Sequence, residues 1–108
     1  MIKLGASVIS PWKPITDPIM LATLGKTLEE LGELTAAISR CIIQGVEEKE
    51  PVTGKPNLEW LAEEIADVIA TLELTMERTG ITRDQIMPRV DNKVARLVEW
   101  RQMLREMK

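Results

Sequence analysis

Histidine is absent from this sequence, and cysteine occurs only once, at Cys41. Without histidine, a Ser-His-Asp triad, a histidine-ligated zinc site and the Glu-x-x-His motifs of di-iron bundles are excluded. One cysteine cannot form a disulfide within the chain, which fits a reducing compartment. Carboxylates and basic side chains are therefore the main candidates for chemistry.

The chain also lacks phenylalanine and tyrosine, so a core must be built from aliphatic residues, methionine and three tryptophans. Its 108 residues are enough for one domain, and 44% of them are hydrophobic, as is usual for a soluble protein. No stretch approaches the roughly 20 apolar residues of a membrane span, and the N-terminus has no signal-peptide pattern. The net charge of -3 argues against a general nucleic-acid binder. We expect a cytoplasmic protein that binds neither membranes nor nucleic-acid polymers.

Apolar residues that recur every three or four positions predict a long helix from Pro18 to Gly45. Asp17 suits the N-cap, proline suits the first helical position, and glycine is common just after a helix. The preceding residues 1–16 have no helical period and are expected to form an extended arm. A frayed terminus is one interpretation of this arm, and packing of Trp12 on a partner subunit is the other. We favour packing of some kind, because an exposed tryptophan lowers solubility.

Two further helices follow, which predicts an all-α fold. One runs from an Asn57 cap to Gly80, and the other begins at a capping box of Thr82 and Gln85 and continues to the C-terminus. A proline inside a helix removes a hydrogen bond, so Pro88 is expected to interrupt or restart the last helix. We therefore expect three to four helices in an antiparallel bundle.

The connection at residues 45–56 is polar and long for a link between packed helices. A plain linker is the simpler interpretation, and a mobile flap that brings Lys49 or Lys55 to a substrate is the alternative. Gly25 and Gly32 each cost a helix about 1 kcal/mol against alanine, which suggests that another backbone approaches there. Because three helices make a thin core, we expect a homodimer or a dimer of dimers to complete the bundle.

The most informative pattern is an acidic motif that occurs twice, Glu-Glu-Leu-Gly-Glu at 29–33 and Glu-Glu-Ile-Ala-Asp at 63–67. Two acids in each motif lie three residues apart, and therefore about 60° apart on one helix face. If the helices pack antiparallel, four carboxylates converge, and they cannot all stay ionised without a cation. Ligation by oxygen alone favours Mg²⁺.

Two observations distinguish these motifs from ordinary solvated helix faces. The second motif lies on the same side of its helix as Trp60 and Leu74, which a purely solvated face would not usually carry. In the last helix, a basic face recurs at spacings of four and three, at Arg89, Lys93 and Arg96. Basic residues near a helix C-terminus also offset its dipole, but beside a carboxylate–Mg²⁺ cluster they would suit phosphate oxygens.

The two acidic motifs, followed by Asp-Asn-Lys-Val-Ala-Arg at 91–96, resemble those of MazG-like all-α nucleoside triphosphate pyrophosphohydrolases. The resemblance covers roughly residues 18–100 and implies a single MazG-like helical domain over 1–108. It implies a Mg²⁺-dependent enzyme that cleaves a nucleoside triphosphate between its α- and β-phosphates, giving a monophosphate and pyrophosphate.

The same resemblance implies the site residues. The catalytic Mg²⁺ ligands would be Glu30, Glu33, Glu64 and Asp67. The residues that contact the substrate would be Arg40, Arg89, Lys93 and Arg96.

Alternatives remain beside this interpretation. Phosphoribosyl-ATP pyrophosphohydrolase shares the acidic pattern, and a non-catalytic helical module that binds nucleotide or another protein is a third reading. Arg40 and Thr71 stand where relatives carry residues that approach the nucleotide, so base specificity cannot be inherited from any relative. Because the chain has no histidine, a carboxylate must accept the proton in hydrolysis, directly or through water.

Overall fold

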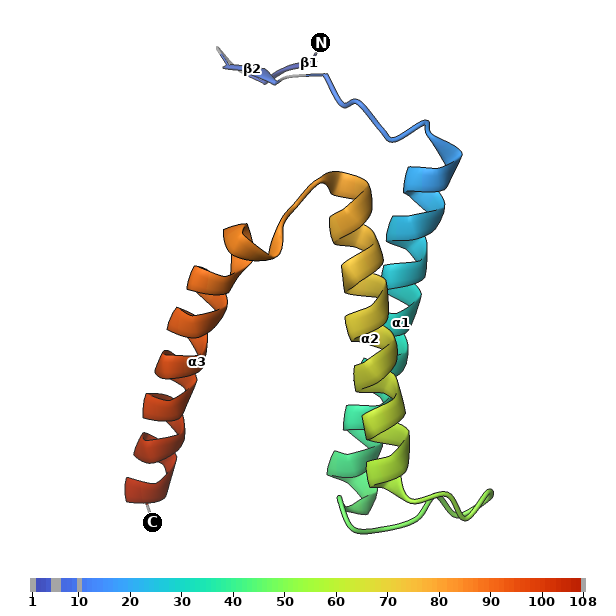
Figure 1. Ribbon diagram of the computed structural model, residues 1–108, viewed down its shortest axis with the longest axis vertical. Coiled ribbons are helices and arrows are strands. Elements are labelled where there is room, and N and C mark those ends of the chain that lie inside the picture. The colour runs from blue at the N-terminus through green and yellow to red at the C-terminus, as the bar shows by residue number, and fades with distance from the viewer. Residues whose placement is uncertain (1, 5–6, 10, 108) are drawn as a thin grey trace.

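The computed structural model describes the backbone of residues 2–4, 7–9 and 11–107, and the side chains of residues 11–107. The described residues form three helices and two short strands (Figure 1). These elements are β1 (Ile2–Leu4), β2 (Ser7–Ile9), α1 (Pro18–Gln44), α2 (Asn57–Thr79) and α3 (Arg83–Glu106). The predicted all-α class is confirmed for the body of the chain, with three helices.

The N-terminal arm differs in part from the prediction. β1 and β2 pair antiparallel, with Ile2 opposite Ile9, so a small hairpin replaces part of the expected extended arm. Pairing lets the two segments satisfy each other's backbone groups, which a single extended segment leaves to water. Residues 11–17 have no regular structure, and Trp12 is 84% exposed. Packing of Trp12 on a partner subunit stays a prediction.

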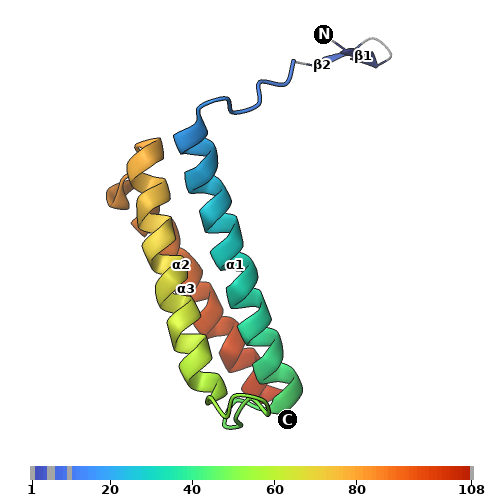
Figure 2. The ribbon, with the colours of Figure 1, turned by 90° about the vertical axis from the view of Figure 1, so that its right-hand side faces the viewer.

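Helices α1 and α2 lie side by side and antiparallel, as both ribbon views show (Figure 2). At one end of this pair, Asp17 caps α1 by accepting a hydrogen bond from the amide of Ile19. Its second carboxylate oxygen lies 2.6 Å from the Arg78 guanidinium near the end of α2. The predicted start of α1 is confirmed, and the same residue fastens the two helices together.

The other end of the pair corrects the expected role of Asn57. Pro56 occupies the N-cap position of α2, and Asn57 is its first residue. The Asn57 side chain is 1% exposed and donates hydrogen bonds to the Gly45 carbonyl at 3.0 Å and to Gln44 Oε1 at 3.3 Å. The Asn57 side-chain amide therefore donates to the end of α1, where carbonyls have no partner within the helix, and it does not cap α2.

The seam between α1 and α2 is narrow and largely polar. Its buried apolar residues are small, namely Ala37, Cys41 and Val68. Thr27 is also buried, with its hydroxyl 2.7 Å from the hydroxyl of Thr75. Many of the larger apolar side chains of α1 and α2, which recur every three or four positions, stay substantially exposed. They include Leu28, Ile38, Ile42, Ile65 and Ile69. The seam alone therefore does not bury the apolar surface that the sequence offers.

Helix α3 stands apart from the α1–α2 pair (Figure 1). Of the described side chains, none in α3 is buried, and its link to α2 is an ion pair near its start, between Arg83 and Glu73 at 3.6 Å. The radius of gyration is 19.5 Å, against about 13 Å for a compact domain of this length. The antiparallel pair is thus confirmed, whereas α3 does not join it within one chain.

The expectation that Pro88 interrupts the last helix is wrong, since α3 is continuous around it. Pro88 is the sixth residue of the helix, so the hydrogen bond it forfeits is one to Asp84, in the first turn. The predicted capping box of Thr82 and Gln85 is present and fixes this start. Among the described residues, no helix is long and apolar enough to cross a membrane.

Candidate metal centre

The antiparallel pairing of α1 and α2 brings the two acidic motifs together. Glu30 and Glu33 come from the middle of α1, and Glu64 and Asp67 come from the middle of α2. One carboxylate oxygen from each of the four lies within 4.8 Å of the others. The convergence that the sequence predicts is therefore present in the structure.

The size of this cluster suits a single hard cation. Opposite ligands of an octahedral Mg²⁺, each about 2.1 Å from the ion, lie about 4.2 Å apart, and those of Ca²⁺ lie about 5 Å apart. The largest separation within the acidic cluster, 4.8 Å, falls in this range. Small side-chain movements would bring the four oxygens to the spacing that Mg²⁺ requires.

Two of the four carboxylates are buried and incompletely satisfied. Glu30 is 7% exposed and Glu64 is 9% exposed. The Oε2 atom of each has no hydrogen-bond partner among the described residues. A buried carboxylate oxygen without a partner is costly, because it has lost its water and gained nothing in return. A bound cation would supply the missing interaction.

The charges of the cluster act on one another. The negative charge of Glu30, followed by burial and the charge of Glu64, raises the pKa of Glu33 above its ordinary range. The nearest counter-charge is Lys26, whose Nζ lies 3.3 Å from Glu30 Oε1. Hydrogen bonds to Glu30 and then to Glu29 raise the pKa of Lys26. Lys26 is half exposed and pairs with only one of the four clustered acids, so the site favours added positive charge.

A pocket of about 260 Å³ adjoins the cluster, with Glu33 and Glu64 in its wall. The rest of the wall consists of Ala36, Ala37, Arg40 and Trp60. The Arg40 guanidinium carbon lies 5.3 Å from the centre of the Trp60 ring. Of the four residues predicted to contact substrate, Arg40 is therefore the one that the structure places beside the acids.

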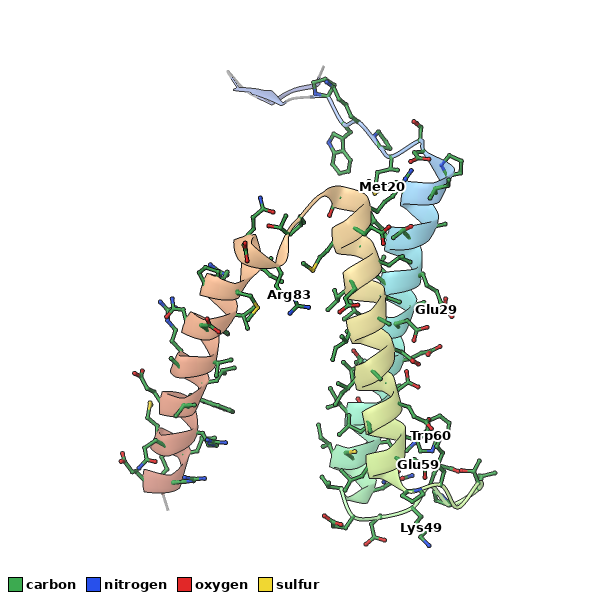
Figure 3. All side chains as sticks on the ribbon, in the orientation of Figure 1. Met20, Glu29, Lys49, Glu59, Trp60 and Arg83 are labelled. Atoms are coloured by element: carbon green, nitrogen blue, oxygen red, sulfur yellow. The ribbon has the colours of Figure 1, made fainter. Side chains whose placement is uncertain are left out.

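The other three predicted substrate contacts lie on α3. Arg89, Lys93 and Arg96 gather with Asn92 around a small pocket of about 90 Å³. Because α3 does not pack on α1 or α2, the structure does not bring this basic face to the acids of the same chain. Glu29, on the acidic motif, extends from the side of the α1–α2 pair that faces away from α3 (Figure 3). A role of the α3 face in substrate binding stays a prediction.

One residue at the site, Lys26, was missed by reasoning from the sequence. Lys26 stands four positions before Glu30, a spacing that places the two side chains together on a helix and could have identified it. Lys55 is one of the two loop lysines that the sequence suggests for an approach to a substrate, but its contact with Trp60 does not follow from their spacing in the sequence. Its Nζ lies 4.2 Å from the centre of the Trp60 ring, a contact that depends on the path of the 45–56 loop.

Comparison of the chain with known protein families, with curated proteins and with solved structures finds no match. The resemblance to MazG-like enzymes therefore rests on the acidic and basic motifs themselves.

Proposed function

We propose that this protein is a Mg²⁺-dependent nucleoside triphosphate pyrophosphohydrolase. The observation that carries the proposal is the acidic cluster, with four carboxylate oxygens within 4.8 Å of one another and two buried oxygens that lack partners among the described residues. The donor set is all oxygen and strongly anionic, which suits Mg²⁺ better than a softer metal. The residues present therefore fit the ion that the motif resemblance implies.

In this proposal, Glu30, Glu33, Glu64 and Asp67 hold the metal. Bound Mg²⁺ supplies positive charge for phosphate oxygens and lowers the pKa of an attacking water. The chain itself contributes the placement of the acids on two helices that are fastened at both ends, by Asp17 and by Asn57. With no histidine available, a carboxylate accepts the proton, either directly or through water.

The proposal includes assembly as a homodimer or a dimer of dimers. The α1–α2 pair and α3 each expose apolar side chains that the described chain leaves uncovered. A second copy would cover them, and its α3 would be the source of the basic face formed by Arg89, Lys93 and Arg96. The substrate would then be a small nucleoside triphosphate bound between subunits.

The decisive experiment is product analysis with Mg²⁺ and a panel of ribo- and deoxyribonucleoside triphosphates, with phosphoribosyl-ATP included. We expect at least one nucleoside triphosphate to give a monophosphate and pyrophosphate. Loss of an anionic ligand weakens a metal's hold, so Glu30→Gln should reduce turnover by about 10–100-fold or more. Glu29→Gln is the matched control, because this neighbour lies outside the cluster and is exposed.

Three outcomes would contradict the proposal. Formation of a diphosphate and orthophosphate would show cleavage at the wrong bond. If phosphoribosyl-ATP were the only compound hydrolysed, the protein would be a phosphoribosyl-ATP pyrophosphohydrolase. Absence of turnover across the panel, in protein that binds Mg²⁺, would leave a non-catalytic nucleotide-binding module.

A further inference from the structure

Trp60 is the centre of a small cationic arrangement beside the acidic cluster. Its indole ring is in contact with two positive groups, the Arg40 guanidinium at 5.3 Å and the Lys55 ammonium at 4.2 Å from the ring centre. Cations are attracted to the face of an indole because its π-electrons are negative there. The ring therefore holds two positive charges next to a site whose acids hold negative ones.

Arg40 belongs to the acidic site directly. It shares the wall of the 260 Å³ pocket with Glu33 and Glu64, two of the proposed metal ligands. A ligand in this pocket would meet the metal on one side and the guanidinium on the other. Arginine presents several N–H donors in a planar fork, which suits the oxygens of a phosphate group.

Lys55 reaches the ring from the loop that joins α1 and α2. Its side chain is 26% exposed and forms an ion pair with Glu63, the first acid of the second motif. The base of the loop is closed by two backbone hydrogen bonds, from the Glu50 amide to the Lys55 carbonyl at 2.9 Å and from the Asn57 amide to the Glu48 carbonyl at 2.9 Å. Lys55 is therefore held in place by the loop as well as by its two partners.

We propose that Arg40 and Lys55 form a clamp for the polyphosphate of the substrate, and that Trp60 is the residue that positions them. The clamp rests on the proposed function, and it assigns the 45–56 loop a part in substrate binding. Both cations are held before a ligand arrives, so less side-chain entropy is lost on binding. Figure 3 shows Trp60 at the loop end of the α1–α2 pair.

The arrangement favours an anion over a nucleobase as the ligand at Trp60. A base that stacked on the indole would compete with the two cations for the ring. An anionic group would instead gain from both, while leaving the cation–ring contacts intact. The indole Nε1 is also buried without a hydrogen-bond partner in the described protein, and a phosphate oxygen is an acceptor that would satisfy such a donor.

Binding of inorganic tripolyphosphate tests the clamp without requiring hydrolysis. Trp60 becomes the single fluorophore when Trp12 and Trp100, which are 84% and 56% exposed, are replaced by phenylalanine. In this background and with Mg²⁺ present, tripolyphosphate should change the Trp60 emission, and a nucleoside without phosphate should not. Loss of a charge-assisted contact should raise the Kd for tripolyphosphate at least about tenfold in Arg40→Gln and in Lys55→Gln.

Matched variants separate a clamp from a merely structural role. Lys49→Gln removes an exposed lysine of the same loop and should leave the Kd unchanged. Lys55→Arg keeps the charge and should restore most of the affinity. Arg40→Lys keeps the charge but loses the planar fork, so it should restore only part of the affinity. For Trp60, phenylalanine retains a ring face and should bind tripolyphosphate better than leucine, and this binding can be followed by calorimetry. Melting curves would show which variants fold.

The results distinguish the clamp from the function on which it rests. If nucleotides are not hydrolysed but tripolyphosphate binds as described, the proposed enzyme fails and the clamp stands. If nucleotides are hydrolysed but folded Arg40→Gln and Lys55→Gln bind tripolyphosphate like the parent, the clamp is overturned. Emission changes caused by the nucleoside alone would also overturn it, because they would place the base at Trp60.

Discussion

The α1–α2 pair and α3 have similar helical signals in the sequence but opposite surroundings in the structure. In the pair, two acids are buried in a seam that is fastened at both ends. In α3, none of the described side chains is buried, although the helix is capped and continuous. The comparison shows that helix formation and burial are separate steps, since caps and periodicity decide the first and long-range packing decides the second.

The difference also divides the proposed site. The acids that would hold a metal come together within one chain, whereas the basic face of α3 does not reach them in that chain and would do so only from a second copy. Arg40 and Lys55 belong to the first region, because they are held against Trp60 by the pair and its loop. The pair should therefore bind metal and polyphosphate without α3, which would add its basic face to the site only after assembly.

The largest effect is expected at the acidic cluster. Mg²⁺ that binds the folded state alone adds RT ln(1 + [L]/Kd) to the free energy of unfolding, about 2.7 kcal/mol at 100 times the Kd. We expect the melting temperature to rise over a Mg²⁺ titration in the parent protein and in Glu63→Gln. Glu64→Gln should lose the rise, and its metal-free form should be more stable than the parent, because one source of repulsion is gone.

Calorimetry on the three proteins, each with and without Mg²⁺, checks this prediction. A metal-induced rise of equal size in Glu64→Gln would remove Glu64 from the site. A metal-free Glu64→Gln protein that melts below the parent would show that repulsion does not dominate there.

An intermediate effect is expected on α3. Its apolar strip, which is uncovered in the described chain, contains Val90, Val94 and Leu97. We expect the parent protein to be a dimer or tetramer by light scattering at micromolar concentration, and Leu97→Asp to dissociate it by placing a charge in the interface. Ala95→Asp is the matched control, because position 95 lies about 160° around the helix from position 97. A monomeric parent, or a Leu97→Asp oligomer of unchanged size, would contradict assembly through this strip.

Much of the fold follows from local chemistry that is visible in the sequence. The N-cap at Asp17, the glycine after each of the first two helices and the capping box of Thr82 and Gln85 are all present as predicted. The acidic cluster was also predictable, because two motifs in matching phase must face each other when the helices pack antiparallel. Each of these features depends on residues within about one helical turn, or on one simple packing assumption.

The rest depends on contacts between distant residues. Asn57 is an ordinary N-cap residue by local preference, but its side chain instead donates a hydrogen bond to the Gly45 carbonyl at the end of α1. Lys55 meets Trp60 only because of the particular path of the 45–56 loop. Gly25 and Gly32 suggest a close neighbour, but among the described residues no such neighbour lies within 4 Å of a Cβ placed at either position. A second copy of the chain is the neighbour that our assembly proposal would supply.

The smallest effect is expected at the far end of the pair, where Asp17 meets Arg78. The hydrogen bond from Arg78, followed by the one from the Ile19 amide, lowers the pKa of Asp17 below its ordinary value of 3.8. The folded protein therefore binds fewer protons than the unfolded chain as the pH falls below that value. The contribution of Asp17 to the free energy of unfolding is complete above pH 3.8 and is lost as the pH falls through the lowered pKa.

Asp17→Asn isolates this charge, because asparagine caps helices about as well as aspartate. We expect the parent to be slightly more stable than Asp17→Asn at neutral pH, since the pair is solvent-exposed, and the difference to disappear in acid. Arg78→Met should show the same loss, because it removes the partner and keeps the cap. Urea unfolding at several pH values measures the free energy of unfolding of the parent and of both variants. The contributions of the other carboxylates are shared by these proteins and largely cancel when the values are subtracted. If the difference in free energy of unfolding between the parent and Asp17→Asn stays constant from neutral to acid pH, the charge of Asp17 does not contribute and the residue acts only as a helix cap.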